Sequence, residues 1–216
     1  MLKNKIFLIH LFFIVYSIIT ALCWPLFAGK LGGIPPTMIW NVFLALLAYD
    51  FINWMIRAKS KISLVISSLF SFLFYPNTFY MITDAKHVAD WFPDLKLTFI
   101  NTQEIIAFVI LLVGIIFGTL LGMEAMRLVL EVFFRKSWQK LLFVIGMSFL
   151  SSVAIYGGRI STLRLNSWDV FIRPIDTIEK LFSIIRLDNM VFLVSFTVYQ
   201  VFVIGLGLWF SLEKRE

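Results

Sequence analysis

Two polar clusters interrupt an otherwise strongly apolar sequence, and both contain side chains that can transfer protons or bind anions. The first, residues 76–87, contains Asp84 and His87. The second, residues 157–169, contains Arg164 among several amide and hydroxyl side chains. A histidine beside a carboxylate can act as a general base near neutral pH, and a guanidinium forms paired hydrogen bonds with carboxylates or phosphates. The clusters therefore indicate either acid–base chemistry or the binding of an anionic group.

The candidate ligand-binding residues come from both clusters and share polar, charged or amphipathic side chains. They are Asn77, Tyr80, Thr83, Asp84, His87, Arg159, Arg164, Asn166, Ser167, Trp168 and Asp169. Asp84, His87 and Asp169 are also the candidates for a catalytic acid, base or metal ligand. A single histidine with scattered carboxylates is a weak metal-binding pattern, so the sequence assigns neither a metal nor another cofactor.

The first cluster follows Pro76, which lacks an amide hydrogen and is expected to kink the preceding helix. If the helix resumes, one face within about 80° of arc carries Asn77, Tyr80, Asp84 and His87. Polar residues gathered on one face inside a membrane are a functional hypothesis by default. Two alternatives stay open. One is a helix end whose side chains cap its own backbone, and the other is a network of Arg and Asp side chains that ties the second cluster to Asp84.

The composition excludes a water-soluble protein. Of the 216 residues, 60% are hydrophobic and 15% are charged, so a lipid bilayer must be the solvent for much of the surface. The formal charge is +6, but the basic residues are spread over the loops and no nucleic-acid-binding motif is present. Cys23 is the only cysteine, which excludes an internal disulfide.

The fold class that we expect is all-α integral membrane, a bundle of about six transmembrane helices in one domain, residues 1–216. A span needs roughly 20 apolar residues, and such stretches lie at 6–27, 36–56, 62–82, 105–123, 141–158 and 190–212. A short amphipathic helix is expected near 177–186, where apolar residues recur at helical spacing opposite charged ones. This helix is too polar to cross the bilayer and is expected to lie on its surface as a lid or anchor beside the clusters.

The basic residues predict the orientation of the bundle. Segments rich in Lys and Arg stay in the cytoplasm. If the N-terminus is cytoplasmic, the segments on that side hold most of the 19 basic residues, namely Lys3, Lys5, Arg57, Lys59, Lys61, Arg127, Arg135, Lys136, Lys140, Lys214 and Arg215. Both termini are therefore expected in the cytoplasm, and both polar clusters on the opposite face. Residues 6–27 are longer than the apolar part of a signal peptide and are interpreted as a retained signal anchor.

Small residues at four-residue spacing predict which helices approach one another closely. The fourth span carries a ridge of Gly114, Gly118 and Gly122, which suits a packing seam. The third and fifth spans carry serine series that each end at a tyrosine, Ser63, Ser67, Ser71 and Tyr75 in one and Ser148, Ser152 and Tyr156 in the other. We expect the two serine faces to pack together and to bring the polar clusters to one place.

Two further groups of charged residues are explained by ion pairs without chemistry. Beyond the fourth span, Arg127, Glu131 and Arg135 recur every four residues and predict a continued helix with an ion-pair ladder. Near the inner end of the second span, Asp50 lies on one helix face with Arg57. That spacing predicts an ion pair that reaches the membrane surface.

At the two clusters the chain resembles a bacterial membrane-protein family catalogued as domain of unknown function 1361. The resemblance rests on Pro76-Asn77, Tyr80, Thr83-Asp84 and His87 in the first cluster, and on Gly158-Arg159, Arg164 and Asn166-Ser167-Trp168-Asp169 in the second. It covers most of the chain and implies a multispan bundle in the bacterial plasma membrane. The resemblance implies no activity.

Three functions are compatible with these residues. The first is a binding or accessory protein whose outward-facing site holds an anionic lipid or a cell-envelope precursor, and which can have a membrane-protein partner; it is motivated by Arg159, Arg164 and Arg173. The second is an outer-leaflet enzyme, such as a metal-dependent hydrolase or transferase, that uses the three catalytic candidates. The third is a transporter, which ranks last because the polar residues lie near span ends and no internal repeat is present.

Overall fold

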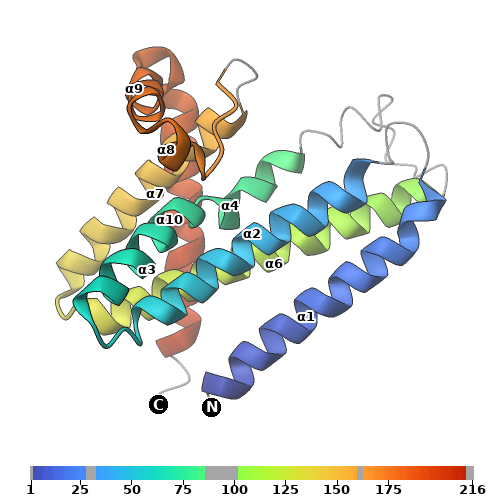
Figure 1. The fold of residues 1–216 in the computed structure, drawn as a ribbon, viewed down its shortest axis with the longest axis horizontal. Coiled ribbons are helices and arrows are strands. Elements are labelled where there is room, and N and C mark those ends of the chain that lie inside the picture. The colour runs from blue at the N-terminus through green and yellow to red at the C-terminus, as the bar shows by residue number, and fades with distance from the viewer. Residues whose placement is uncertain (1, 28–32, 86–101, 160–162, 213–216) are drawn as a thin grey trace.

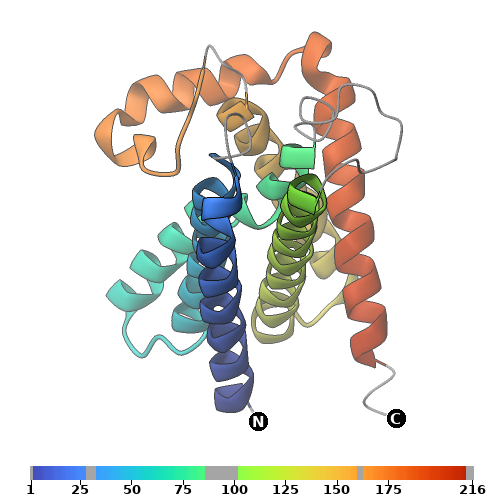
Figure 2. The same cartoon turned by 90° about the vertical axis from the view of Figure 1, so that its right-hand side faces the viewer.

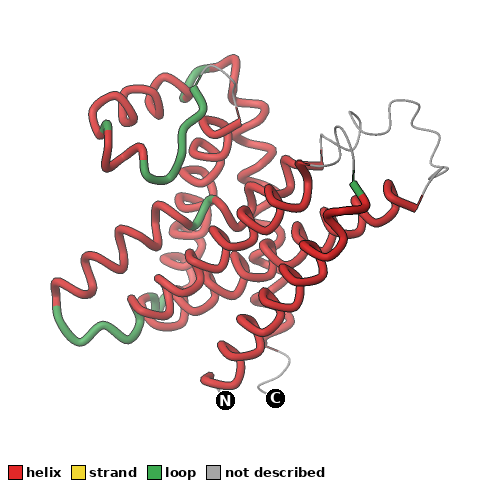
Figure 3. Tube along the Cα trace, turned by 45° about the vertical axis from the view of Figure 1, so that its right-hand side comes forward, coloured by secondary structure: helices red, strands yellow, loops and turns green. Residues whose placement is uncertain are grey.

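The computed structural model describes residues 2–27, 33–85, 102–159 and 163–212. Within these ranges the chain is helical, with short turns between helices and no strand (Figure 3). His87 lies outside the described residues. Its expected role as an acid, a base or a metal ligand therefore stays a prediction.

Six helical segments are long and apolar enough to cross a membrane, as the sequence predicts. They are α1 (Leu2–Cys23), α2 (Ile34–Met55), α3 (Lys61–Phe74) with the short helices that continue it, α6 (Thr102–Phe133), α7 (Ser137–Arg159) and α10 (Met190–Leu212). The start of α1 and the end of α10 lie at the same end of the bundle (Figure 1). We call this the terminal end and the opposite one, where α9 (Pro174–Ile184) lies, the α9 end.

A short helix lies across the α9 end (Figure 2). This helix is α9 (Pro174–Ile184), and it is flanked by the short helix α8 (Asp169–Ile172) and the 3-10 turn η4 (Leu187–Asn189). The amphipathic helix expected near 177–186 is therefore present but begins earlier, at Pro174, whose fixed φ suits the first turn of a helix. Another 3-10 turn, η1 (Trp24–Leu26), ends the first span.

The predicted break at Pro76 is confirmed. Helix α3 ends at Phe74, and the chain continues as α4 (Asn77–Tyr80) and the 3-10 turn η3 (Met81–Ala85). The amides of Phe79 and Tyr80 both bond to the carbonyl oxygen of Pro76, at 3.2 and 2.9 Å. Because Pro76 itself donates no hydrogen bond, the chain changes direction here, and the first polar cluster forms two short turns instead of one continuous helix.

The glycine ridge of α6 is a packing seam, as its spacing predicts. A Cβ atom at Gly118 would lie 3.0 Å from the carbonyl oxygen of Thr78 in α4, and one at Gly122 would lie 2.7 Å from the ring of Phe79. At Gly114 the neighbour is the Tyr16 hydroxyl of α1, at 2.8 Å. The absence of side chains on this ridge therefore allows the backbone of α4 to lie directly against α6.

The prediction that the serine faces of α3 and α7 pack together is wrong. Ser152 of α7 lies 3.2 Å from the hydroxyl of Thr197 in α10, and the amide of Gln200 donates to the Ser152 hydroxyl at 3.0 Å. In α3, the Ser71 hydroxyl donates to the carbonyl of Ser67 in its own helix at 2.6 Å. Four-residue spacing identifies a small polar face, but a buried glutamine on α10 offers it a stronger hydrogen-bond partner than a second serine face does.

Helix α6 extends well beyond the span 105–123 that hydropathy predicts and ends at Phe133, so it contains the Arg127–Glu131 step of the expected ladder but not Arg135. Arg127 pairs with Glu131 at 2.6 Å and with Glu124 at 2.7 Å, and Lys5 of α1 also reaches Glu124 at 2.7 Å. The prediction for Asp50 is wrong. Its carboxylate lies 3.1 Å from the ring of His10 in α1 instead of pairing with Arg57, because the neighbouring helix brings a partner close while Arg57 lies beyond the end of α2.

A valine at Gly118 should destabilise the fold by about 1–3 kcal/mol, because its side chain meets the backbone of α4 and cannot be accommodated without strain. Gly205→Val is the matched control, since a Cβ at Gly205 has no neighbour within 4 Å. Unfolding of both variants in detergent measures the effect. Equal stability of the two variants would show that the seam does not exist.

Candidate functional site

The two polar clusters meet through the side chain of Arg159 at the end of α7. Its Nη2 donates to a carboxylate oxygen of Asp84, and its Nε donates to the hydroxyl of Thr83. The guanidinium also lies 4.7 Å from the ring centroid of Tyr80, a cation–π geometry. The prediction that the clusters converge is therefore confirmed, and of the two alternatives left open by the sequence, the structure contains the Arg–Asp contact.

The carboxylate of Asp84 is engaged on both of its oxygens. Its second oxygen accepts a hydrogen bond of 3.0 Å from the side-chain amide of Asn41, in the first half of α2. The Asp84 side chain is 6% exposed and that of Arg159 is 16% exposed. A charged group can be buried at this depth only with such partners. Asp84 therefore joins α2, η3 and α7, and each of its carboxylate oxygens accepts a hydrogen bond from another helix.

The loop that precedes α8 is held by a reciprocal turn. The backbone N–H of Asn166 donates to the Asp169 carboxylate at 2.7 Å, and the backbone N–H of Asp169 donates back to the backbone carbonyl of Asn166 at 3.0 Å. The Leu165 amide bonds to the carbonyl of Gly157 at 3.2 Å, which folds the loop back onto α7. The Asp169 side chain therefore shapes this loop and is 9% exposed.

The remaining residues of the loop contact the first cluster and its neighbours. The Asn77 amide donates to the Ser167 hydroxyl at 3.0 Å. The ring of Trp168 lies 5.8 Å from that of Phe74 and 5.9 Å from that of Trp40. The loop thus contacts α2, α3 and α4 at once. We call the contacts made by Asn77, Thr83, Asp84, Arg159, Ser167 and Trp168 the clasp.

Two arginines of this region are outside the clasp. Arg164 is exposed, has a positive φ of 40° and forms no ion pair within the residues that the structure describes. Arg173 is 57% exposed and lies 3.6 Å from Asp169 and 3.9 Å from Asp176. Both guanidinium groups remain accessible to an anion at the α9 end. Asn166 is also exposed there.

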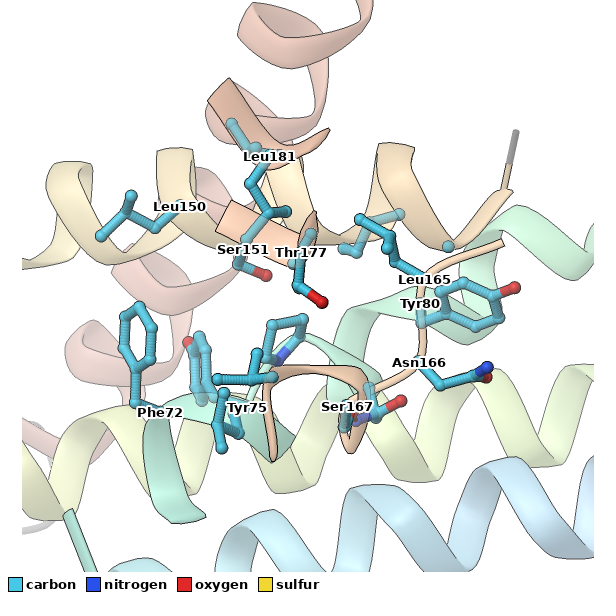
Figure 4. A pocket seen from close by; sticks show the side chains of 18 of the residues that line it. Phe72, Tyr75, Tyr80, Leu150, Ser151, Leu165, Asn166, Ser167, Thr177 and Leu181 are labelled. Atoms are coloured by element: carbon cyan, nitrogen blue, oxygen red, sulfur yellow. Dashed lines mark hydrogen bonds between the residues drawn. The ribbon is translucent and has the colours of Figure 1, made fainter. Parts of the chain in front are cut away.

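A cavity of about 400 Å³ lies beneath the clasp and α9. Figure 4 shows it between the α3–α4 segment on one side and α7 with α9 on the other. Its polar rim consists of Asn77, Asn166 and Ser167. Most of its remaining wall is apolar, with Phe72 and Leu150 as examples. A volume in the range of ~300–1,000 Å³ with a mostly apolar wall and a few polar groups is typical of ligand sites.

Three hydroxyl groups of the cavity wall have no hydrogen-bond partner. They belong to Tyr75, Ser151 and Thr177, and each of these residues is 2% exposed. Sequence reasoning missed Ser151 and Thr177 as site residues. Ser151 lies outside the four-residue series of Ser148 and Ser152, and Thr177 is a polar residue on the apolar face of α9. In both cases the sequence signal was a hydroxyl that departs from the pattern of its helix.

Sequence reasoning also missed Asn41. A side-chain amide within a span is a functional hypothesis by default, and its partner Asp84 lies 43 positions later in the chain. The predicted site residues in or against the clasp are Asn77, Tyr80, Thr83, Asp84, Arg159, Ser167 and Trp168. Asn166 and Asp169 hold the adjoining loop, Arg164 is exposed beside it, and His87 lies outside the described ranges. In those ranges no group of three His, Cys, Asp or Glu residues is arranged to hold a metal ion.

Residues 40–203 match a family model described as "Protein of unknown function (DUF1361)". The chain belongs to this family. The matched range contains both polar clusters, the clasp and the helices that line the cavity. Comparison with curated proteins and with solved structures gave no match.

Removal of either partner of the buried ion pair should destabilise the DUF1361 bundle by about 3–5 kcal/mol, because the other charge stays buried without its partner. The variants are Asp84→Asn, Arg159→Met and the double variant, and the double variant should lose little more than either single one. Arg164→Met is the control, since that arginine is exposed in the same region and should leave the free energy of unfolding nearly unchanged. Additive losses in the cycle would show that the two side chains do not interact.

Proposed function

We propose that this membrane protein binds a lipid with an anionic headgroup in the cavity beneath α9. The cavity carries this proposal, because an apolar volume that ends at a polar rim matches a molecule with an apolar tail and a polar head. A wholly polar ligand would leave its groups against apolar walls, at a cost in desolvation. A purely apolar ligand would leave the amides of the rim without a role.

The charge of the rim supports an anionic headgroup. Arg164 and Arg173 are both exposed beside the loop that forms the rim. A phosphate accepts paired hydrogen bonds from a guanidinium, and the interaction is strengthened next to a low-dielectric region. Arg159 contributes indirectly, since it is committed to Asp84 and holds the rim in place.

The outer surface of α8 and α9 supports a location at the membrane interface. Large apolar side chains are exposed there, among them Ile172 and Ile175 at 70% and 73%. On the same helix Lys180 pairs with Asp176 at 2.9 Å. A helix with one apolar and one charged face lies in the plane of the bilayer surface. In that position α9 separates the cavity from the surrounding lipid, as a lid would.

The proposed orientation follows the charge bias of the sequence. The terminal end, with both termini, lies in the cytoplasm of a bacterial cell, and the α9 end faces outward from the plasma membrane. The bound lipid then belongs to the outer leaflet or to the envelope side of the membrane. Binding is favoured over catalysis, because Asp84 and Asp169 are both held by hydrogen bonds of the clasp and the loop.

The orientation predicts which cysteines an impermeant thiol reagent reaches from outside the cell. In a Cys23→Ser background, Ser183→Cys on α9 should be labelled and Ser137→Cys at the start of α7 should not. Both serines are exposed, so they form a matched pair. Labelling of position 137 alone would reverse the orientation.

Filling the cavity should abolish lipid binding. Ala154 lines the cavity and Leu142 faces outward on the same helix, so Ala154→Trp and Leu142→Trp are matched variants. We expect at least tenfold weaker binding of a fluorescent phosphatidylglycerol by Ala154→Trp in detergent micelles, and unchanged binding by Leu142→Trp.

The charge requirement is tested with the same assay. Arg164→Glu should reduce the preference for phosphatidylglycerol over phosphatidylcholine, because it places a negative charge beside the headgroup. Unfolding temperatures of all three variants confirm that they are folded. Unchanged binding by a folded Ala154→Trp protein would show that the cavity is not the binding site.

A further inference from the structure

Several buried hydroxyls of the bundle lack a hydrogen-bond partner, and three of them lie together in the wall of this cavity. The hydroxyls of Ser67 and Thr78 donate to carbonyls of their own chain segment at 2.6 and 2.8 Å, which is the usual arrangement in an apolar environment. Those of Tyr75, Ser151 and Thr177 have no partner at all. Figure 4 shows these three side chains directed into the space between the α3–α4 segment and α7 with α9.

An unpaired buried hydroxyl costs roughly 1–3 kcal/mol relative to a paired one. Three of them around one cavity are therefore a large cost for the empty protein. Each is an O–H donor, and a bound molecule with acceptor oxygens at the same depth would remove this cost. The ligand is thus expected to carry neutral acceptors inside the cavity as well as an anionic group at the rim.

The position of the hydroxyls relative to the rim defines the depth of those acceptors. Ser151 precedes Gly158, where α7 meets the rim loop, by about two helical turns or roughly 10 Å. This depth is comparable with the headgroup and interfacial layer of one leaflet, about 5–8 Å thick. The acceptors therefore lie directly below the headgroup and above most of the hydrocarbon.

A second cavity continues the first toward the terminal end. Its volume is about 440 Å³, and Phe72, Tyr75 and Met147 line both cavities. The deeper wall is almost wholly apolar and includes Phe133 and Phe143. The path from rim to terminal end therefore runs from charged, through hydroxyl-lined, to hydrocarbon-like surroundings.

We propose that the ligand is an ester-linked glycerolipid, whose ester carbonyls accept hydrogen bonds from Tyr75, Ser151 and Thr177 and whose acyl chain extends into the deeper cavity. This inference rests on the proposed function and narrows its ligand class. A polyprenyl phosphate, the other kind of phosphate-bearing envelope lipid, has hydrocarbon directly below its phosphate. It would leave all three hydroxyls unpaired.

The test compares three probes on the full-length protein in detergent. They are a diacyl phosphatidylglycerol, its dialkyl ether analogue without ester carbonyls, and undecaprenyl phosphate. We expect the ester lipid to bind about tenfold more tightly than the ether lipid, since a hydrogen-bond contribution of about 1.4 kcal/mol corresponds to a factor of ten, and more tightly than the polyprenyl phosphate.

The triple variant Tyr75→Phe, Ser151→Ala, Thr177→Val should bind the ester and ether lipids equally. Ser183→Ala is the control on α9, because its exposed hydroxyl already donates to the carbonyl of Lys180 at 2.7 Å; it should keep the difference. The triple variant without lipid should unfold at the same or a higher temperature than the wild type, since it loses unpaired polar groups.

Equal binding of ester and ether lipids by the wild type, or tightest binding of the polyprenyl phosphate, would overturn the glycerolipid assignment while leaving a lipid site intact. Binding of none of the three probes would overturn the lipid site itself. A large loss of stability in the lipid-free triple variant would show that the hydroxyls support the fold instead of a ligand, and would also overturn the assignment.

Discussion

The buried ion pair between Arg159 and Asp84 is the constraint on which the α9 end of the molecule depends. It joins the end of α7 to η3, while Asn41 adds α2 through the second carboxylate oxygen. Breaking such a pair exposes one buried charge to an apolar environment, so the clasp holds three spans at a fixed separation. The loop before α8, which forms the rim of the cavity, is anchored to the end of α7 and to α4. Together with the ion pair, these anchors keep a space open between α3 and α7. The cavity is a consequence of this fixed frame.

The membrane architecture was predictable from residue types because lipid imposes a simple rule. A span must satisfy its own backbone and present apolar side chains over about 20 residues, and each of the six spans meets this rule. Local features were predictable for the same reason. Pro76 breaks α3 because it lacks an amide hydrogen, and Gly118 and Gly122 admit α4 because they lack side chains. The break at Pro76 depends only on residues a few positions away, and the glycine spacing predicts a close approach without specifying that α4 makes it.

Contacts between distant segments were harder to predict, because spacing within one helix does not specify the partner. The serines of α7 meet Gln200 instead of α3, and Asp50 meets His10 instead of Arg57. The contacts of Asp84 and Asp169 were equally hard to predict from the sequence. Types and positions made both candidates for acids or bases, and the structure adds the donors that each carboxylate contacts. The cavity and its three hydroxyls arise from the gaps between helices, which have no signature in any single helix.

A density map of the protein in nanodiscs made from bacterial lipids tests the central claim most directly. The clasp should be closed, with Arg159 against Asp84, and an elongated lipid density should run from the rim near Asn166, past Tyr75, Ser151 and Thr177, toward the terminal end. A map in which α3 and α7 pack directly against each other, with the cavity filled by their own side chains, would contradict the account.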